Sequence, residues 1–343
     1  MIPSEQVDGS RPTTLSDVAQ TAGVSVATAS KALNGRPDVS AATRRRVLDV
    51  AELLSFAPNE IARNLASGRT GTVGLLTSDL DGRFVLPVLM GAEDALGAGQ
   101  VSVLLCDARG DAIREQHHLR ALLSRRVDGI IVVGASTNAR VSLGQNLPVP
   151  VVYVYAPSSS DADLSLTPDN VGGGRLAVEH LVTIGRRRIA HISGDSSYQA
   201  ARDRSTGALA ALADAGLELV GDPLFSTWSE HWGRDAAGLL LSAHPDVDAI
   251  VCGSDQIARG VIDTLRDLGR TVPDDIAVVG FDNWEVLATN SRPELTSIDP
   301  NLQALGRAGA RAIFESIDLG SVSPGLRKMP PRLVIRGSSV SRR

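Results

Sequence analysis

The chain has 343 residues, of which 43% are hydrophobic and 21% are charged, proportions that are ordinary for a globular protein and exclude a disordered chain. It has no run of about 18 apolar residues to span a bilayer, and its start, MIPSEQVDGSR, lacks the apolar core of a secretion signal, so we expect a cytoplasmic protein. The net charge of −5 is unevenly distributed, because residues 11–70 hold eight Lys/Arg and five Asp/Glu, a net charge of +3 that leaves −8 for the rest. A basic N-terminal segment on an otherwise acidic chain predicts that this segment alone binds phosphates.

The first part of the chain has the pattern of a small helical domain. After a flexible tail at residues 1–12, residues 13–57 predict a helix-turn-helix domain with three helices. Gly23 permits the left-handed turn that ends the first helix, while Ser25 and Ser40 are placed to cap the second and third. The apolar positions that should face the core are Leu15, Val18, Ala19, Ala29, Ala32, Leu33, Val47, Val50, Ala51 and Leu54.

The outer face of the second helix is predicted to read DNA. Its members, at helical spacing, are Val26, Ala27, Ser30, Lys31 and Asn34. Small residues at the start of a short helix, with a cation one turn later, fit a major groove about 12 Å wide. Val26 and Ala27 are expected to touch thymine methyl groups and Lys31 to reach guanine; the predicted phosphate contacts are Ser25, Thr28, Ser30 and Asn34. The alternative is a plain helical hairpin whose outer face is only solvated.

A fragment after the third helix is too short to be stable alone. Pro58 breaks the chain, and Asn59 caps Glu60–Ala66 within a predicted hinge and linker at residues 58–70. Seven residues are fewer than the roughly 12–15 that an independent helix needs, so we expect this segment to become ordered only when docked. Leu65 is then an apolar wedge for a minor groove. The remaining predicted DNA contacts are Thr14, Leu15, Asn59 and Ala62. Without the preceding helices, a frayed linker would be the preferred interpretation.

Residues 71–343 alternate apolar strand-like runs with amphipathic helical stretches. This alternation predicts an α/β fold of parallel sheets covered by helices on both faces. The pattern restarts after roughly 85 residues, which predicts two similar doubly wound lobes. We expect a crossing at Ala156–Asp163, with lobe 1 at about 71–156 and 283–300 and lobe 2 at about 157–282 and 301–340. Ligands of such sheets bind beyond the carboxyl ends of the strands, here in a cleft between the lobes.

A series of motifs runs from about Thr13 to Ser338 and includes TLSDVAQTAGVSVATASKALNG, PNEIARNLASGRTGTVGLL, RRVDGIIVVG, DNVGGGRLAVEHLVTIGRRRIAHISG, VPDDIAVVGFDN, RPELTSIDPNLQALGR and PRLVIRGSS. In content and order it resembles the lactose-repressor/galactose-repressor (LacI/GalR) family of bacterial transcription regulators. The resemblance implies a periplasmic-binding-protein-like domain of two lobes behind the DNA-binding domain. It also implies a homodimer that binds pseudo-palindromic double-stranded operator DNA and holds a small effector, usually a sugar, between the lobes.

The same resemblance implies an effector site. Phe84 matches an aromatic residue that packs on the effector, and Trp228 matches the aromatic platform of the second lobe. Arg204 and Asp282 match an arginine and an acid that bind effector hydroxyls or a carboxylate. Aromatic faces, a guanidinium fork and a carboxylate suit a sugar ring. The alternative is that the aromatics belong to the core and that Arg204 and Asp282 form an ordinary ion pair.

Three positions depart from the family pattern. Gly82-Arg83 stands where Asn-Pro is common, Ser254 stands for the asparagine of A-N-D-Q, and Tyr155 stands for an acid. Tyr155 and Ser254 complete the predicted effector site. Each departure changes the hydrogen-bonding groups of the pocket, so the effector of no single relative is carried over.

We therefore expect a ligand-responsive, sequence-specific transcriptional regulator located at the nucleoid. It is most simply a repressor of carbohydrate-utilisation genes that a sugar releases from its operator. The ending SSVSRR, with no leucine heptad, favours a dimer without a tetramerisation helix. No catalytic residue, cofactor or metal site is predicted, the six histidines are scattered, and Cys106 and Cys252 are expected to be reduced core thiols.

Two other classes of protein fit parts of the sequence. An NAD-dependent oxidoreductase is suggested by Gly172-x-Gly174-x-x-Ala177 with Asp195 downstream, which mimics a dinucleotide fingerprint, but the preceding LSLTPDN predicts a poor strand. A transport-type sugar-binding protein would share the two lobes, but it would need an export signal and no DNA-reading head.

Overall fold

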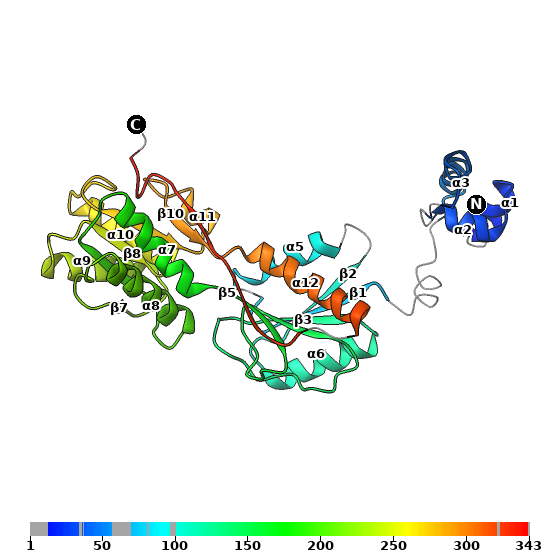
Figure 1. Ribbon diagram of the computed structural model, residues 1–343, viewed down its shortest axis with the longest axis horizontal. Helices are drawn as coiled ribbons and strands as arrows, with labels where there is room; N and C mark the ends of the chain where they lie inside the picture. The colour runs from blue at the N-terminus through cyan, green and yellow to red at the C-terminus, as the bar shows by residue number, and fades with distance from the viewer. Residues whose placement is uncertain are drawn as a thin grey trace, which may run out of the picture. The chain divides into compact units, whose positions relative to one another are not determined.

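The computed structural model describes residues 13–33, 36, 38–56, 70–80, 82–96, 101–320 and 323–341. The chain divides into two compact units, residues 1–70 and residues 71–343, which we call the head and the body (Figure 1). The division falls at residue 71, where the sequence predicts that the second domain begins.

Local signals build the three helices of the head, which are α1 (Leu15–Thr21), α2 (Val26–Leu33) and α3 (Ala41–Leu53). As predicted, the hydroxyls of Ser25 and Ser40 accept the N–H groups of Thr28 and Thr43 at 3.1 and 3.2 Å. Gly23 has a φ of +63°, in the region that favours glycine. The helices enclose a core of Val18, Ala19, Ala22, Ala29, Ala32, Val47 and Ala51. The predicted helix-turn-helix fold of the head is confirmed.

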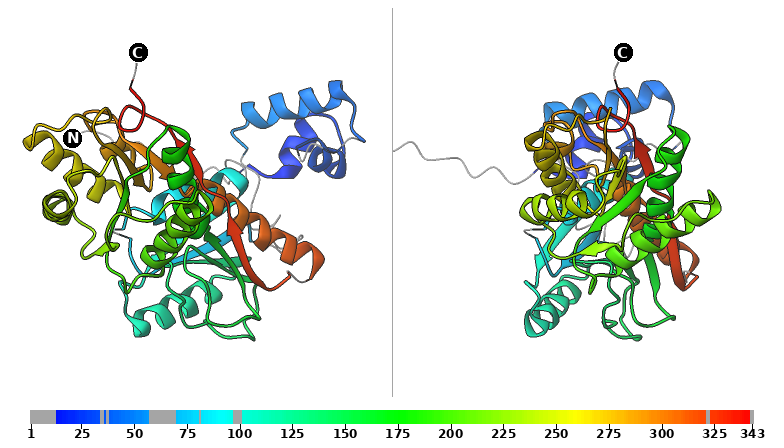
Figure 2. Two further views of the ribbon diagram at one scale, coloured as in Figure 1. Left: turned by 60° about the vertical axis from the view of Figure 1, so that its left-hand side comes forward. Right: turned by 90° about the vertical axis from the view of Figure 1, so that its left-hand side faces the viewer.

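The first lobe of the body is built on a six-stranded sheet with the order β11-β5-β4-β3-β1-β2, in which every strand pair is parallel. Its strands are β1 (Thr72–Thr77), β2 (Ser102–Asp107), β3 (Gly129–Val133), β4 (Val151–Val154), β5 (Leu164–Pro168) and β11 (Gly325–Met329). One face packs against α5 (Val85–Leu96) and α12 (Leu302–Leu319), and the other packs against α6 (Ala112–Ser124) (Figure 2).

The second lobe repeats this architecture with the order β12-β10-β9-β8-β6-β7, in which only the pair of β12 with β10 is antiparallel. Its strands are β6 (Ile189–Ser193), β7 (Leu224–Phe225), β8 (Ala249–Cys252), β9 (Ala277–Phe281), β10 (Thr296–Asp299) and β12 (Arg332–Val334). Its helices are α7 (Asn170–Thr183) and α8 (Gln199–Asp214) on one face, α9 (Glu230–Ala243) and α10 (Asp255–Asp267) on the other, and the short α11 (Glu285–Ala288). Strands β6, β8 and β9 are buried along their whole length, as a covered parallel sheet requires.

The boundaries of the lobes differ from the sequence prediction. Because β5 pairs with β4, the chain first crosses between lobes at Asp169, after β5, and not at residues 156–163. It crosses back between β10 and α12 and a third time between β11 and β12 (Figure 1). The prediction was therefore wrong for residues 283–299, which belong to the second lobe. It was also wrong for residues 302–319 and 325–329, which belong to the first.

Strand β5 also decides how the glycine motif is interpreted. The strand directly precedes the glycines, contrary to prediction, but it belongs to the first-lobe sheet, whereas the glycines lie inside α7 of the second lobe. The two elements form no βαβ unit, which the dinucleotide fingerprint requires. Instead, a Cβ on Gly174 would lie 2.0 Å from the carbonyl oxygen of Arg204, and one on Gly207 would lie 1.9 Å from that of Val171. These glycines allow α7 and α8 to pack backbone against backbone.

We expect Gly207→Ala to lower the melting temperature by several degrees, because the added methyl group must push α7 away from α8 and overpacking costs about 1–3 kcal/mol. The control is Gly238→Ala in α9, where a Cβ would meet nothing within 4 Å and should leave stability unchanged or slightly raised. Thermal unfolding followed by circular dichroism measures both. Equal melting temperatures for the two variants would contradict the packing role.

Candidate functional site

The outer face of α2 is exposed as the sequence predicts. Val26, with 47% of its surface exposed, Ala27 and Lys31 are accessible, and Thr28 and Ser30 are half-buried. Small apolar groups and a cation therefore stand together on the helix that would enter a major groove.

The other predicted DNA contacts have different placements. Ser25 is exposed, and its hydroxyl lies 2.8 Å from that of Thr28. Thr14 is exposed and begins α1 in a capping box with Asp17. Leu15 is half-buried against the head core, as its predicted core position requires, so part of its side chain stays accessible. The remaining predicted contacts lie outside the described residues; they are Asn34, Asn59, Ala62 and Leu65.

Lys31 already has an anionic partner within the head. Its Nζ donates to Asp38 at 2.6 Å, and about half of each side chain is exposed. This hydrogen bond lowers the pKa of Asp38. Any base or phosphate that Lys31 binds must compete with this carboxylate.

The second candidate site is a cavity in the body, lined by both lobes. Its volume is about 340 Å³; the first lobe contributes Asp79, Gly82, Arg83, Phe84, Ala135, Ser136, Thr137 and Tyr155, and the second contributes Tyr198, Ala200, Arg204, Trp228, Gln256, Asp282 and Trp284. Many of these residues directly follow β1, β3, β4 and β9, so the cavity lies where ligands of such sheets bind. Five of the six predicted effector residues line it: Phe84, Tyr155, Arg204, Trp228 and Asp282.

Three charged side chains form the floor of this cavity, and we call Arg83, Arg204 and Asp282 the Asp282 triad. Arg83 reaches from the first lobe to Oδ2 of Asp282 and also donates to Oε1 of Gln256 at 3.1 Å. Arg204, from the same lobe as Asp282, lies 3.5 Å from Oδ1. Each oxygen of the Asp282 carboxylate thus faces one arginine. The Asp282 side chain is only 3% exposed.

Rigid surroundings hold the triad in place. Arg204 is buried, donates to Oδ1 of Asn170 at 2.9 Å and to the carbonyl of Gly253, and lies 3.6 Å over the ring of Phe281. The backbones of Tyr155 and Asp282 have φ values of +74° and +101°, which non-glycine residues rarely adopt. Such strain persists where surrounding contacts enforce it, and it is common at functional sites.

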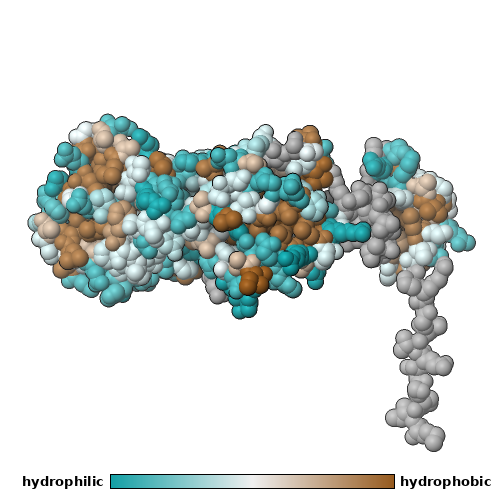
Figure 3. All heavy atoms as spheres, turned by 90° about the horizontal axis from the view of Figure 1, so that it is seen from below, coloured by the Kyte–Doolittle hydropathy of each residue, from teal (hydrophilic) through white to brown (hydrophobic). Residues whose placement is uncertain are grey.

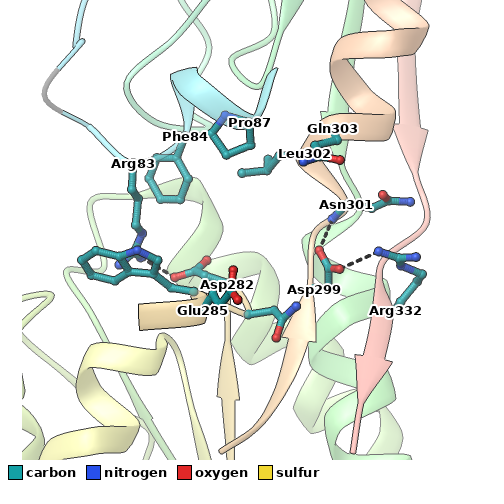
Figure 4. Close-up of a pocket in the computed structure, with 12 residues that line it drawn as sticks. Arg83, Phe84, Pro87, Asp282, Glu285, Asp299, Asn301, Leu302, Gln303 and Arg332 are labelled. Carbon is teal, nitrogen blue, oxygen red and sulfur yellow. Dashed lines mark hydrogen bonds and ion pairs between the residues drawn. The ribbon is translucent and has the colours of Figure 1, made fainter. Parts of the chain in front are cut away.

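Arg83 also borders a neighbouring cavity of about 380 Å³, shown in Figure 4. The guanidinium carbon lies 4.9 Å from the ring centroid of Phe84 and 5.0 Å from that of Trp284. In Figure 4, Arg83 extends from the first-lobe loop towards Asp282, and Asp299 accepts hydrogen bonds farther along the cavity. Arg83 thus lines both cavities and links the first lobe to Asp282 of the second.

Aromatic rings and unpartnered polar atoms complete the lining. Phe84 stacks on Tyr155 with centroids 4.6 Å apart, and burial raises the pKa of the Tyr155 phenol, which therefore stays protonated. Among the described residues, buried Nε of Arg83, Nε1 of Trp228 and Oγ1 of Thr137 have no hydrogen-bond partner. Buried polar groups are normally paired, so these atoms indicate where a ligand would bind.

Ser254 departs from the prediction. It does not line the cavity; it is fully buried, and its hydroxyl caps α10 by accepting the N–H of Ile257 at 3.3 Å. The chain instead presents Gln256, two residues later in the GSDQ motif. Sequence reasoning noted Arg83 only as a departure and did not identify Thr137, Tyr198 or Trp284. Trp284 directly follows the GFDN motif, which was the one available signal for it.

Asp255, in the second lobe, fixes the backbone of the cavity-lining residue Trp284. It is fully buried, and its two oxygens accept hydrogen bonds of 2.6 Å from the Ser297 hydroxyl and the Trp284 N–H. Burial raises the pKa of Asp255 to about 7, and the charge of Asp282 adds to the rise.

Other classes of site gain no support from the part of the chain that the structure describes. It contains no group of three or more His, Cys, Asp or Glu residues that could hold a metal ion. No helix in these ranges is long and apolar enough to cross a membrane. Both cysteines are free thiols; Cys252 is buried and Cys106 is half-buried.

Known proteins resemble this chain along nearly its whole length. Residues 14–59 match the family described as bacterial regulatory proteins, lacI family, and residues 178–339 match a periplasmic binding protein-like domain. Catabolite control protein A of Priestia megaterium is 32% identical, covering 95% of this chain and 99% of the relative. The HTH-type transcriptional repressor PurR of Mannheimia succiniciproducens is 30% identical, covering 95% and 98%.

Two solved structures are similar over 96% of this chain and 100% of their own. The complex of the transcriptional regulator CelR with cellobiose has a TM-score of 0.63 and 30% identity. The lac repressor dimer bound to operator and the anti-inducer ONPF has a TM-score of 0.69 and 26% identity.

The raised pKa of Asp255 predicts a pH-dependent cost to stability. The folded protein binds this proton more tightly than the unfolded chain, so the group's stabilising contribution is complete at acid pH and is lost as the pH rises through about 7. Asp255→Asn, which stays neutral, should therefore raise the melting temperature relative to wild type by a few degrees more at pH 8 than at pH 5. Exposed Asp246, whose pKa is lowered by a hydrogen bond from Arg188, is ionised at both pH values, so Asp246→Asn should change the melting temperature equally at pH 5 and pH 8. A pH-independent effect of Asp255→Asn would contradict the assignment.

Proposed function

The chain belongs to the LacI family of bacterial regulatory proteins, and we propose that it is a repressor of carbohydrate-utilisation genes that a sugar effector releases from its operator. Family membership establishes the coarser statement, that the chain is a ligand-responsive DNA-binding regulator of transcription. What we propose beyond this is that the protein represses transcription, that its effector is a sugar and that it is located at the nucleoid.

The observation that carries the sugar class is the composition of the cavity. Rings of Phe84, Tyr155 and Trp228 stand beside the charged Asp282 triad in a space of about 340 Å³. Aromatic faces pack against the apolar side of a sugar ring, and polar groups around them fix its oxygens. A regulator of similar fold, CelR, has been solved in complex with cellobiose.

The head supports the DNA-binding part. Val26 and Ala27 are exposed at the start of α2, and Lys31 follows one turn later. We assign thymine methyl contacts to the first two and a guanine contact to Lys31. Ser25, Thr28 and Ser30 are assigned to phosphates, which position the helix without reading sequence.

We expect the protein to act as a homodimer on a pseudo-palindromic site. Helix α5 exposes Leu86 and Met90, four residues apart and therefore on one helix face, with 53% and 54% of their surfaces accessible. The face of the body in Figure 3 carries several apolar patches separated by polar side chains. The lac repressor, similar in fold, is a dimer on its operator, and two-fold protein symmetry requires two-fold related half-sites.

The proposed mechanism follows from the shared lining of the cavity. Because both lobes contribute to it, a ligand that prefers one arrangement of the lobes shifts the protein towards that arrangement. In a dimer this shift would change the distance between the two hinge segments predicted at residues 58–70 and so weaken their binding to the operator.

The direct test is to select binding sites from random double-stranded DNA with the purified protein and to titrate sugars into the complex. We expect a site with two-fold symmetry and release of the DNA by at least one sugar or sugar derivative. A selected site without symmetry would contradict the dimeric mode. Tighter DNA binding in the presence of the sugar would contradict release and favour a co-repressor.

We expect Lys31→Ala to weaken binding to the selected site by about 10–100-fold, since a guanine contact is worth about 1–3 kcal/mol, and to weaken binding to unrelated DNA much less. Lys328→Ala is the matched control, because it removes the only other lysine of the sequence, exposed on β11, and should change neither affinity. Fluorescence anisotropy at one fixed salt concentration measures both. Equal losses on the two DNAs would rule out a base contact by Lys31.

A further inference from the structure

We propose that Arg83 determines the ligand class of this cavity and that the effector is an acidic sugar derivative, with a carboxylate or phosphate group that faces Arg83. The inference rests on the proposed function, because it names the effector of that same site. It concerns a residue at which this chain departs from its family, where an arginine stands beside the first aromatic residue of the pocket.

The first argument is that the cavity has few free acceptors. The acid expected to hold sugar hydroxyls, Asp282, is 3% exposed and faces Arg83 and Arg204 with its two oxygens. Oε1 of Gln256 accepts from Arg83, and Oδ1 of Asp79 accepts the N–H of Gly82 at 2.9 Å. A sugar hydroxyl placed beside Asp282 or Gln256 would therefore compete with arginine donors for its acceptor, which is costly in a buried site.

The second argument is that unpartnered donors remain. Nε of Arg83 and Nε1 of Trp228 are buried without partners and can only donate, while Oγ1 of Thr137 is buried without a partner and can donate or accept. The phenol of Tyr155 stays protonated because burial raises its pKa. An ionised carboxylate or a phosphate dianion only accepts, and charge-assisted hydrogen bonds to such groups are stronger than neutral ones. The hydrogen-bonding inventory of the cavity therefore matches an anion better than a hydroxyl.

The third argument is the charge balance at the floor. The Asp282 triad combines two arginines with one carboxylate, so the cations are in excess at a site where Arg204 and Asp282 are nearly closed to water. Buried Asp255 behind the triad offsets this excess only in part near neutral pH, because its pKa is raised to about 7. Asp79 adds a second carboxylate to the lining, so the excess of cations is confined to the triad itself. An anionic ligand that contacts Arg83 would offset this local excess, since an unbalanced buried charge is costly.

The geometry of Arg83 explains why a ligand can engage it without dismantling the site. Its guanidinium lies between the rings of Phe84 and Trp284, and its two Nη atoms are held by Asp282 and Gln256. Nε of the same planar group is buried and has no hydrogen-bond partner among the described residues. The side chain is thus oriented before the ligand arrives, and pre-organised donors lose little conformational entropy on binding.

The test is isothermal titration calorimetry on the full-length protein with three probes that share one ring, D-glucose, D-glucuronate and D-glucose 6-phosphate, at constant ionic strength. Inorganic phosphate is titrated as a probe of charge alone. We expect one acidic sugar to bind at least about tenfold more tightly than glucose, a difference of about 1.4 kcal/mol, and more tightly than inorganic phosphate.

Three variants assign the preference to Arg83. Arg83→Gln should bring the acidic sugar and glucose to within about twofold of one another, and Arg83→Lys, which keeps the charge, should retain part of the preference. Arg140→Gln is the matched control, since Arg140 also pairs with a half-buried acid in the first lobe, Glu115, but does not line the cavity. It should keep the full preference. Thermal unfolding confirms that each variant is folded.

Several results would overturn the proposal. They are glucose binding as tightly as both acidic sugars, a preference that survives in Arg83→Gln, inorganic phosphate binding as tightly as the sugars, and no binding of any probe. Glucose binding as tightly as both acidic sugars would contradict only the acidic class of effector, because it would still show that the site binds a sugar. Operator binding, measured without a ligand, tests the proposed function independently of all four.

Discussion

The carboxylate of Asp282 is the group on which the arrangement of the cavity depends. It lies almost completely out of water and accepts hydrogen bonds from Arg204 in its own lobe and from Arg83 in the other. A buried carboxylate is tolerated only when it is paired, so this one group ties the two lobes together electrostatically. Arg83 and Asp282 both line the two neighbouring cavities, so their contact shapes each of them.

The head and the body share one electrostatic arrangement, a cation paired with an internal carboxylate. In the head, Lys31 is paired with Asp38, and in the body, Arg83 is paired with Asp282. In each site an internal carboxylate engages the cation that is expected to meet the ligand. A neutral partner would compete poorly with such a carboxylate, whereas a phosphate or carboxylate can do so. In the body this arrangement favours an acidic effector, whereas in the head the Asp38 carboxylate sets a cost that the guanine contact proposed for Lys31 must exceed.

The sequence predicted what neighbouring residues determine and missed what distant residues determine. The caps at Ser25 and Ser40 and the turn at Gly23 are local signals, and each was confirmed. Lobe boundaries depend on pairing across the chain, and the polar strand β5 is defined by its neighbours β4 and β11. Likewise, Arg83 and Asp282 are 199 residues apart, and no local pattern reveals their contact. Five of the six effector residues predicted from the family motifs line the cavity, whereas Ser254 caps a helix.

The central claim is that Arg83 and Asp282 act as a coupled pair that joins the lobes. A double-mutant cycle with Arg83→Gln, Asp282→Asn and the double variant, measured by denaturant unfolding of the ligand-free protein, tests it most directly. The account predicts a favourable coupling free energy of roughly 0.5–3 kcal/mol, as found for residues in direct contact. Additive effects of the two substitutions, within about 0.3 kcal/mol, would contradict it.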